Sequence, residues 1–130
     1  MKNLLFGIFT CLCALIMVSC AGNTPTAKAE AYLEDMKDGN YTEVVDHLYF
    51  KKAMTDKDKA NLVAMLDDKG KKSIEKEGAI ESYEIISETI SEDGTTAKVE
   101  YTMKYAGGAE KNESINLITI DGKWMVDSGK

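Results

Sequence analysis

Arginine is absent from this 130-residue chain: its 16 basic residues are all lysines, and 22 acidic residues bring the net charge to −6. Arginine is the side chain best suited to clamp phosphate or carboxylate groups through two parallel hydrogen bonds. Nucleic-acid binding requires a basic face, whereas the acidic residues here are spread along the chain. The composition therefore excludes nucleic acid as a partner, and the length indicates one domain.

Cysteine is scarce, and its three positions all fall near the N-terminus. Cys11 and Cys13 lie within the apolar run of residues 4–18, and Cys20 follows that run. The run is shorter than the roughly 20 apolar residues of a membrane-spanning helix. A positive start at Lys2, a short apolar run and then a small residue are typical of a secretory signal.

Residues 17–20, Met-Val-Ser-Cys, resemble the lipobox of bacterial lipoproteins. The resemblance implies cleavage before Cys20 and acylation of its thiol, although Met17 stands where leucine is usual. It predicts a signal peptide over residues 1–19 and a lipidated cysteine with a tether over 20–24. An uncleaved anchor, or an ordinary signal with a chance cysteine, is the alternative.

Loss of the signal would leave Cys20 as the single, lipidated cysteine of the mature chain. We therefore expect no disulfide, no cysteine-based zinc site and no cofactor. Ala21 is not the aspartate that retains enteric lipoproteins at the inner membrane, and no acidic cluster follows. In a Gram-negative source, the expected partner is thus the outer membrane, with the domain facing the periplasm.

Proline is equally rare, and the only one, Pro25, follows Thr24 in the manner of a helix N-terminus. The spacing of apolar residues predicts helices over 25–38 and 41–49. A third helix is predicted from about residue 55 to residue 78. The core stripe that we expect for this third helix consists of Leu62, Met65 and Leu66.

Beyond Gly78 the pattern changes to alternation, which predicts antiparallel strands at about 80–91, 95–106, 111–120 and 123–128. The residues of the second strand that we expect to face inward are Ala97, Val99, Tyr101, Met103 and Tyr105. The predicted fold class is α+β, with three helices packed on a curved four-stranded antiparallel meander over residues 25–130.

Several short segments carry a family resemblance: Tyr32-Leu33, Gly39-Asn40-Tyr41, the strand meander and the terminal Trp124-Met125-Val126-Asp127. They resemble small bacterial lipoproteins of the family called domain of unknown function 4878, once labelled lumazine-binding-like. This family is similar to the nuclear transport factor 2-like superfamily. The resemblance implies a cone with a pocket between helices and sheet. The superfamily holds enzymes, ligand binders and protein-binding modules, so the fold does not decide the function.

Aromatic and methionine side chains are the candidate lining of such a pocket, because tyrosine combines an apolar body with a hydroxyl and methionine adapts to irregular shapes. The candidates are Tyr32, Met36, Tyr101, Met103, Tyr105 and Trp124. Simple core packing is the alternative for all of them, and for Trp124 above all.

His47, the only histidine, is the candidate acid or base at the border of the second helix's apolar stripe. The alternative is a half-packed boundary residue, since the sequence assigns it no acid partner. Among the strand acids, Glu100 faces outward, and we expect Glu84 and Glu88 on a solvated outer face. No metal site is expected, because the acid pairs lack the spacing of a calcium loop.

The predicted function is a lipid-anchored envelope protein with a non-enzymatic domain that binds a small apolar or aromatic ligand or an envelope protein. One alternative is a cofactor-free isomerase, dehydratase or hydrolase using His47 or a strand acid. That alternative requires a charged side chain within the pocket, hydrogen-bonded to a tyrosine. Another is a structural subunit, with a filled cone and an exposed apolar patch.

Overall fold

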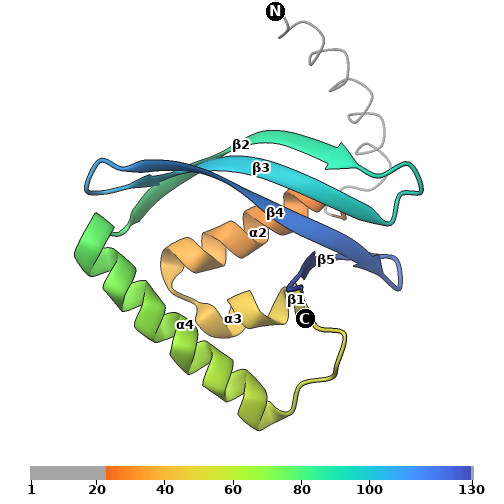
Figure 1. The fold of residues 1–130 in the computed structure, drawn as a ribbon, viewed down its shortest axis with the longest axis horizontal. Helices are drawn as coiled ribbons and strands as arrows, with labels where there is room; N and C mark the ends of the chain where they lie inside the picture. The colour runs from red at the N-terminus through yellow and green to blue at the C-terminus, as the bar shows by residue number, and fades with distance from the viewer. Residues whose placement is uncertain (1–22, 130) are drawn as a thin grey trace, which may run out of the picture.

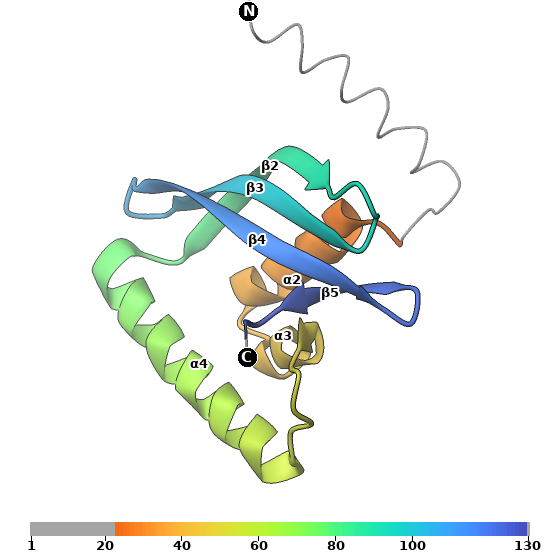
Figure 2. The ribbon, with the colours of Figure 1, turned by 45° about the vertical axis from the view of Figure 1, so that its right-hand side comes forward.

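A computed structural model describes residues 23–129, so the predicted signal peptide and Cys20 lie outside the described residues. The helices are α2 (Pro25–Asp38), α3 (Tyr41–Asp46) and α4 (Asp56–Glu77), and the strands are β1 (Leu48–Tyr49), β2 (Ile80–Ile90), β3 (Thr96–Tyr105), β4 (Glu110–Ile120) and β5 (Lys123–Asp127). The strand order in the sheet is β1-β5-β4-β3-β2. The sheet curves over α2 and α3, and α4 runs beside its concave side (Figures 1 and 2).

The α+β class is confirmed, and β2 to β5 form the predicted antiparallel meander, but the prediction of four strands is wrong because a fifth joins the sheet. The helix expected over 41–49 ends at Asp46, and the next residues form β1, which pairs in parallel with β5. The pairing is held by hydrogen bonds from the Val126 amide to the His47 carbonyl, 2.9 Å, and from the Ser128 amide to the Tyr49 carbonyl, 3.2 Å. The sheet is therefore five-stranded and mixed.

The first predicted helix is confirmed at both ends. The Thr24 hydroxyl accepts a hydrogen bond from the Ala27 amide, 3.0 Å, and Pro25 occupies the first turn. Gly39 closes the helix in the left-handed conformation, with φ 76°. Ala29 and Leu33 are fully buried in the core beneath the sheet. Helix α2 thus covers the concave face of the sheet.

The predicted alternation of β3 is confirmed as well. Four of the five residues expected to face inward are buried, and Tyr105 is half-buried. Together with Ile115, Leu117, Trp124 and Val126 they form the sheet's contribution to the core.

Strand β2 departs from its predicted faces because a bulge follows Ile85. An extra residue shifts the alternation by one position, so everything beyond it changes face. Glu88 consequently lies opposite Val99, on the inner face, and accepts hydrogen bonds from the Thr26 amide, 3.0 Å, and the Thr26 hydroxyl, 2.6 Å. The expectation of a solvated Glu88 is therefore wrong, whereas Glu84 is exposed as expected.

Helix α4 begins as predicted, with a reciprocal cap between Thr55 and Asp58, but its predicted core stripe is wrong. None of its residues is buried; Met65 is 46% exposed, and Leu62 and Leu66 are half-buried. The reason is geometric: α2 already covers the sheet, so α4 lies outside it and packs on α3. Within residues 23–129, no helix is both long and apolar enough to cross a bilayer.

Candidate functional site

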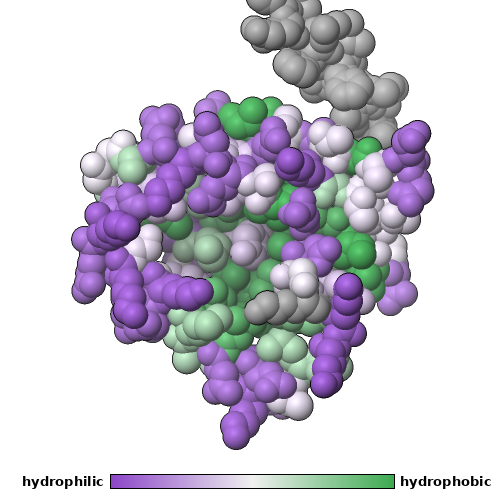
Figure 3. All heavy atoms as spheres, in the orientation of Figure 1, coloured by the Kyte–Doolittle hydropathy of each residue, from purple (hydrophilic) through white to green (hydrophobic). Residues whose placement is uncertain are grey.

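A cavity of about 440 Å³ lies between α2, α4 and the concave face of the sheet. Figure 3 shows it as a hollow with hydrophobic side chains inside and hydrophilic ones around it. The side chains of its apolar and aromatic wall are Tyr32, Leu33, Met36, Tyr41, Leu66, Ile74, Ile80, Tyr101, Met103 and Tyr105. The cavity therefore combines an apolar interior with several hydroxyl groups.

One face of helix α2 and the inner face of strand β3 both line this cavity. On α2, Tyr32 and Met36 are four residues apart and share one face of the helix. On β3, Tyr101, Met103 and Tyr105 are two residues apart and share the inner face of the strand. The fold brings these two faces together.

A carboxylate stands at the tyrosine end of the cavity. The register of β3 and β4 places Glu113 opposite Tyr101, so both lie on the inner face. The Tyr101 hydroxyl donates a hydrogen bond to Glu113 Oε1, 2.9 Å. Glu113 itself is exposed at the mouth, where water reaches it.

The tyrosine hydroxyls near Glu113 are held in their neutral form. Burial, followed by the hydrogen bond to Glu113, raises the pKa of Tyr101. Burial and then the charge of Glu113 raise the pKa of both Tyr32 and Tyr105. At neutral pH the Tyr32 and Tyr105 hydroxyls can donate a hydrogen bond to a molecule in the cavity, whereas the Tyr101 hydroxyl, which donates to Glu113, can accept one.

Beside this end, Lys111 joins the sheet to α4. It forms an ion pair with Glu77, at the last turn of α4, and its ammonium lies 5.4 Å from the centroid of the Tyr105 ring. The Gly107 amide adds a backbone hydrogen bond to the Glu77 carbonyl, 2.9 Å. These contacts fix the C-terminal end of α4 against the sheet.

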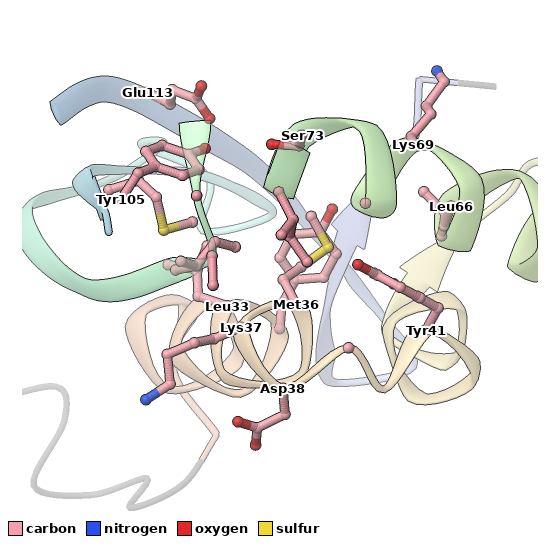
Figure 4. Close-up of a pocket in the computed structure, with 18 of the residues that line it drawn as sticks. Leu33, Met36, Lys37, Asp38, Tyr41, Leu66, Lys69, Ser73, Tyr105 and Glu113 are labelled. Carbon is pink, nitrogen blue, oxygen red and sulfur yellow. The ribbon is translucent and has the colours of Figure 1, made fainter. Parts of the chain in front are cut away.

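At the other end, α4 approaches α3 closely at Gly70. A Cβ atom at Gly70 would lie 2.0 Å from the Tyr41 hydroxyl oxygen, so the mid-helix glycine provides the space that this ring occupies. Figure 4 shows the Tyr41 hydroxyl directed toward Met36 and the interior of the site. Gly70 thereby lets Tyr41 reach the cavity.

The structure brings five of the seven predicted lining residues together at the cavity: Tyr32, Met36, Tyr101, Met103 and Tyr105. Trp124 does not line it, because its strand lies at the other side of the sheet's core, where its side chain is buried. The prediction that Trp124 lines the pocket is therefore wrong, and the alternative, core packing, holds.

His47 does not line the cavity either, because α3 ends before it and its ring turns toward α2. Its Nε2 lies 2.8 Å from Asp35 Oδ2, so the expectation that it lacks an acid partner is wrong. Its Nδ1 lies 3.2 Å from the Lys28 ammonium, which can only donate. Nδ1 is therefore the acceptor, Nε2 donates to Asp35, and the three side chains link α2 to α3.

Sequence reasoning missed Glu113, although a signal was present. Lys111, Glu113, Ile115 and Leu117 are spaced by two and share one face of β4, and the buried Ile115 and Leu117 identify that face as the inner one. Among residues 23–129, no group of three or more histidine, cysteine or acidic side chains is arranged to hold a metal ion.

The fold of this chain is similar to that of a protein from Campylobacter jejuni described as an NTF2-like transpeptidase, with a TM-score of 0.64 and 18% sequence identity. The match covers 80% of this chain and 97% of that protein. A second match, the intermembrane space region of the chloroplast protein ARC6, has a TM-score of 0.39 and 12% identity, covering 81% and 94%. The similarity to the Campylobacter jejuni protein shows that this chain has the nuclear transport factor 2-like fold, and nothing about its function. No curated protein matches this chain. The model of the family called Domain of unknown function (DUF4878) matches residues 18–127, and the chain belongs to that family.

Proposed function

We propose that this chain is a lipid-anchored envelope protein whose cavity binds a small, largely apolar molecule without converting it. The observation that carries the proposal is the cavity itself. Its volume of about 440 Å³ falls in the range of small-molecule sites, roughly 300–1,000 Å³. Its wall of apolar, methionine and tyrosine side chains is the usual composition of such sites.

Apolar surface inside the cavity supplies the driving force. Ile74 is 52% exposed and Leu66 half-buried, although both line the cavity. Covering such surface with a ligand stabilises the complex by roughly 25 cal/mol per Å² of apolar area removed from water. The neutral hydroxyls of Tyr32 and Tyr101 then orient the polar part of the ligand. A purely structural subunit would instead be expected to have a filled cone.

An enzymatic role is the second candidate, because one observation favours it. The hydrogen bond between Tyr101 and Glu113 places a charged group beside a tyrosine in the pocket, as a cofactor-free isomerase, dehydratase or hydrolase requires. We rank it second because Glu113 is exposed to water at the mouth. His47, the other candidate, is engaged by Asp35 and Lys28 away from the cavity.

Filling the cavity with an indole ring should abolish binding. Ser73 lines the cavity from α4, so Ser73→Trp would occupy it without removing a core residue. With the neutral fluorescent probe N-phenyl-1-naphthylamine, we expect the affinity of Ser73→Trp to fall by at least about tenfold. The matched control is Ala60→Trp, at an exposed position of the same helix. Equal affinity in the two variants would contradict the proposal.

Native mass spectrometry of the purified chain separates the two candidates. A bound molecule that is recovered unchanged supports the binding function. Its conversion during incubation, lost in Glu113→Gln, would support the enzyme instead.

The lipid anchor is proposed from the resemblance of residues 17–20 to a lipobox and predicts an outer-membrane protein that faces the periplasm. Helix α2 begins only a few residues after Cys20, which would hold the cavity near the membrane and raise its effective concentration there. Expressed in a Gram-negative host, the chain should begin at Cys20 and carry the mass of an acyl-glycerol group. Cys20→Ser should retain residues 1–19, whereas Cys13→Ser should be processed normally. An unlipidated Cys20 in the processed wild type would contradict the anchor.

A further inference from the structure

We infer that the cavity selects small apolar molecules that carry one ammonium group, which Glu113 and the surrounding tyrosine rings hold. This inference rests on the binding function proposed above. It follows from the arrangement of charges around the cavity and from the chemistry of its aromatic end.

Among the residues that the structure describes, four charged side chains line the cavity: Lys37, Asp38, Lys69 and Glu113. Figure 4 shows Lys37, Asp38 and Lys69 directed away from its interior, and the Lys37 ammonium lies 3.4 Å from Glu34. Glu113 differs from them, because it lies on the inner face of the sheet beside the tyrosines. The charge that a bound molecule meets at this end is therefore negative.

The charge of Glu113 can hold a bound cation, with or without an N–H group. Within residues 23–129 its carboxylate accepts one hydrogen bond, from Tyr101, although a carboxylate offers about four acceptor positions, so most of its surface can face a bound cation. Tyr32 and Tyr105 line the same cavity as Glu113, and its charge raises the pKa of both. A cation at this point would meet the Glu113 carboxylate and the tyrosine rings Tyr32 and Tyr101.

Tyrosine rings attract cations through the negative charge of their faces. The structure contains one example, since the Lys111 ammonium already lies over the Tyr105 ring. Lys111 is also neutralised by its ion pair with Glu77, so it opposes a second cation only weakly. An anionic ligand, by contrast, would be repelled by Glu113 and would find no arginine anywhere in the chain.

A matched series of decyl compounds tests the inference, with displacement of N-phenyl-1-naphthylamine as the measurement. We expect decyltrimethylammonium to bind at least about tenfold more tightly than decanol, which corresponds to about 1.4 kcal/mol, and decanoate to bind most weakly. Glu113→Gln keeps the shape of the side chain and should reduce the preference to within about threefold. Glu110→Gln removes the same charge from the outer face of the same strand and should leave the preference intact.

The alternative outcomes are distinguishable. Equal binding of the three compounds, tighter binding of decanoate, or an unchanged preference in Glu113→Gln would overturn ammonium selection while the binding function stands. The same holds if the probe binds, is blocked by Ser73→Trp, and is displaced by none of them. Failure of Ser73→Trp to affect the probe would overturn both proposals.

A further compound identifies the source of the ammonium group. Decylphosphocholine carries the same quaternary ammonium beside a phosphate. Binding as tight as that of decyltrimethylammonium supports a lipid headgroup as the natural source. Weaker binding supports a free amine, because the phosphate would then be repelled by Glu113.

Discussion

Leu33→Ala should lower the free energy of unfolding by about 3 kcal/mol. Deleting a fully buried leucine side chain typically costs about 2–5 kcal/mol, because the transfer free energy is lost and a void is left behind. Leu33 has no solvent exposure and packs in the core between α2 and the sheet. Chemical denaturation of wild type and variant, followed by circular dichroism, measures the difference.

Leu66→Ala is the matched control, since it removes the same atoms from the helix that was expected to contribute core residues. Leu66 is half-buried on α4 and lines the cavity. We expect it to cost less than about 1 kcal/mol of unfolding free energy and to weaken binding of the naphthylamine probe. A loss of stability equal to that of Leu33→Ala would mean that α4 belongs to the core.

The parts of the fold that were predicted correctly depend on local signals. Thr24 and Pro25 indicate where α2 begins, and Gly39 indicates where it ends. The faces of β3 follow from alternation over ten residues. In each case the information lies within one turn or one strand, so no knowledge of the partner segment is needed.

The predictions of local structure that were wrong concern segments whose conformation depends on a distant part of the chain. Strand β1 has only two residues, too few for a periodic pattern, and exists because β5 offers it a parallel edge. The bulge after Ile85 depends on the register with β3, and it turns Glu88 toward Thr26. The periodicity of α4 is real, but of its predicted core stripe only Leu66 lines the cavity, and no residue of the helix is buried, because α2 already covers the sheet.

The candidate site was predicted in part for the same reason. The tyrosines and methionines of α2 and β3 could be identified by their faces, because each element has a regular period. Glu113 was missed because an acidic residue on a strand suggests solvent, although it shares its face with the apolar Ile115 and Leu117; the pairing with Tyr101 shows that it faces inward. The bond between His47 and Asp35 depends on how α3 packs on α2, which neither helix specifies alone.

Gly78→Ala should be comparably destabilising, by about 2–6 kcal/mol. Gly78 has φ 89° and ψ 169°, a backbone region that is essentially restricted to glycine and costs a residue with a Cβ roughly 1–3 kcal/mol. That Cβ would also lie 2.7 Å from the amide nitrogen of Gly107. Because the clash is with backbone, a rotamer change does not relieve it, and overpacking of this kind costs about 1–3 kcal/mol.

Gly94→Ala is the control at a positive φ that lacks the clash. Gly94 has a similar φ, 73°, but a Cβ there would meet no atom within 4 Å. It should therefore cost only about 1–2 kcal/mol, the conformational part. The junction at Gly78 also holds the end of α4 against the turn that follows β3, so Gly78→Ala should shift the cavity wall and weaken probe binding, whereas Gly94→Ala should not. Equal stability losses, with probe binding intact in both variants, would show that this junction does not position α4.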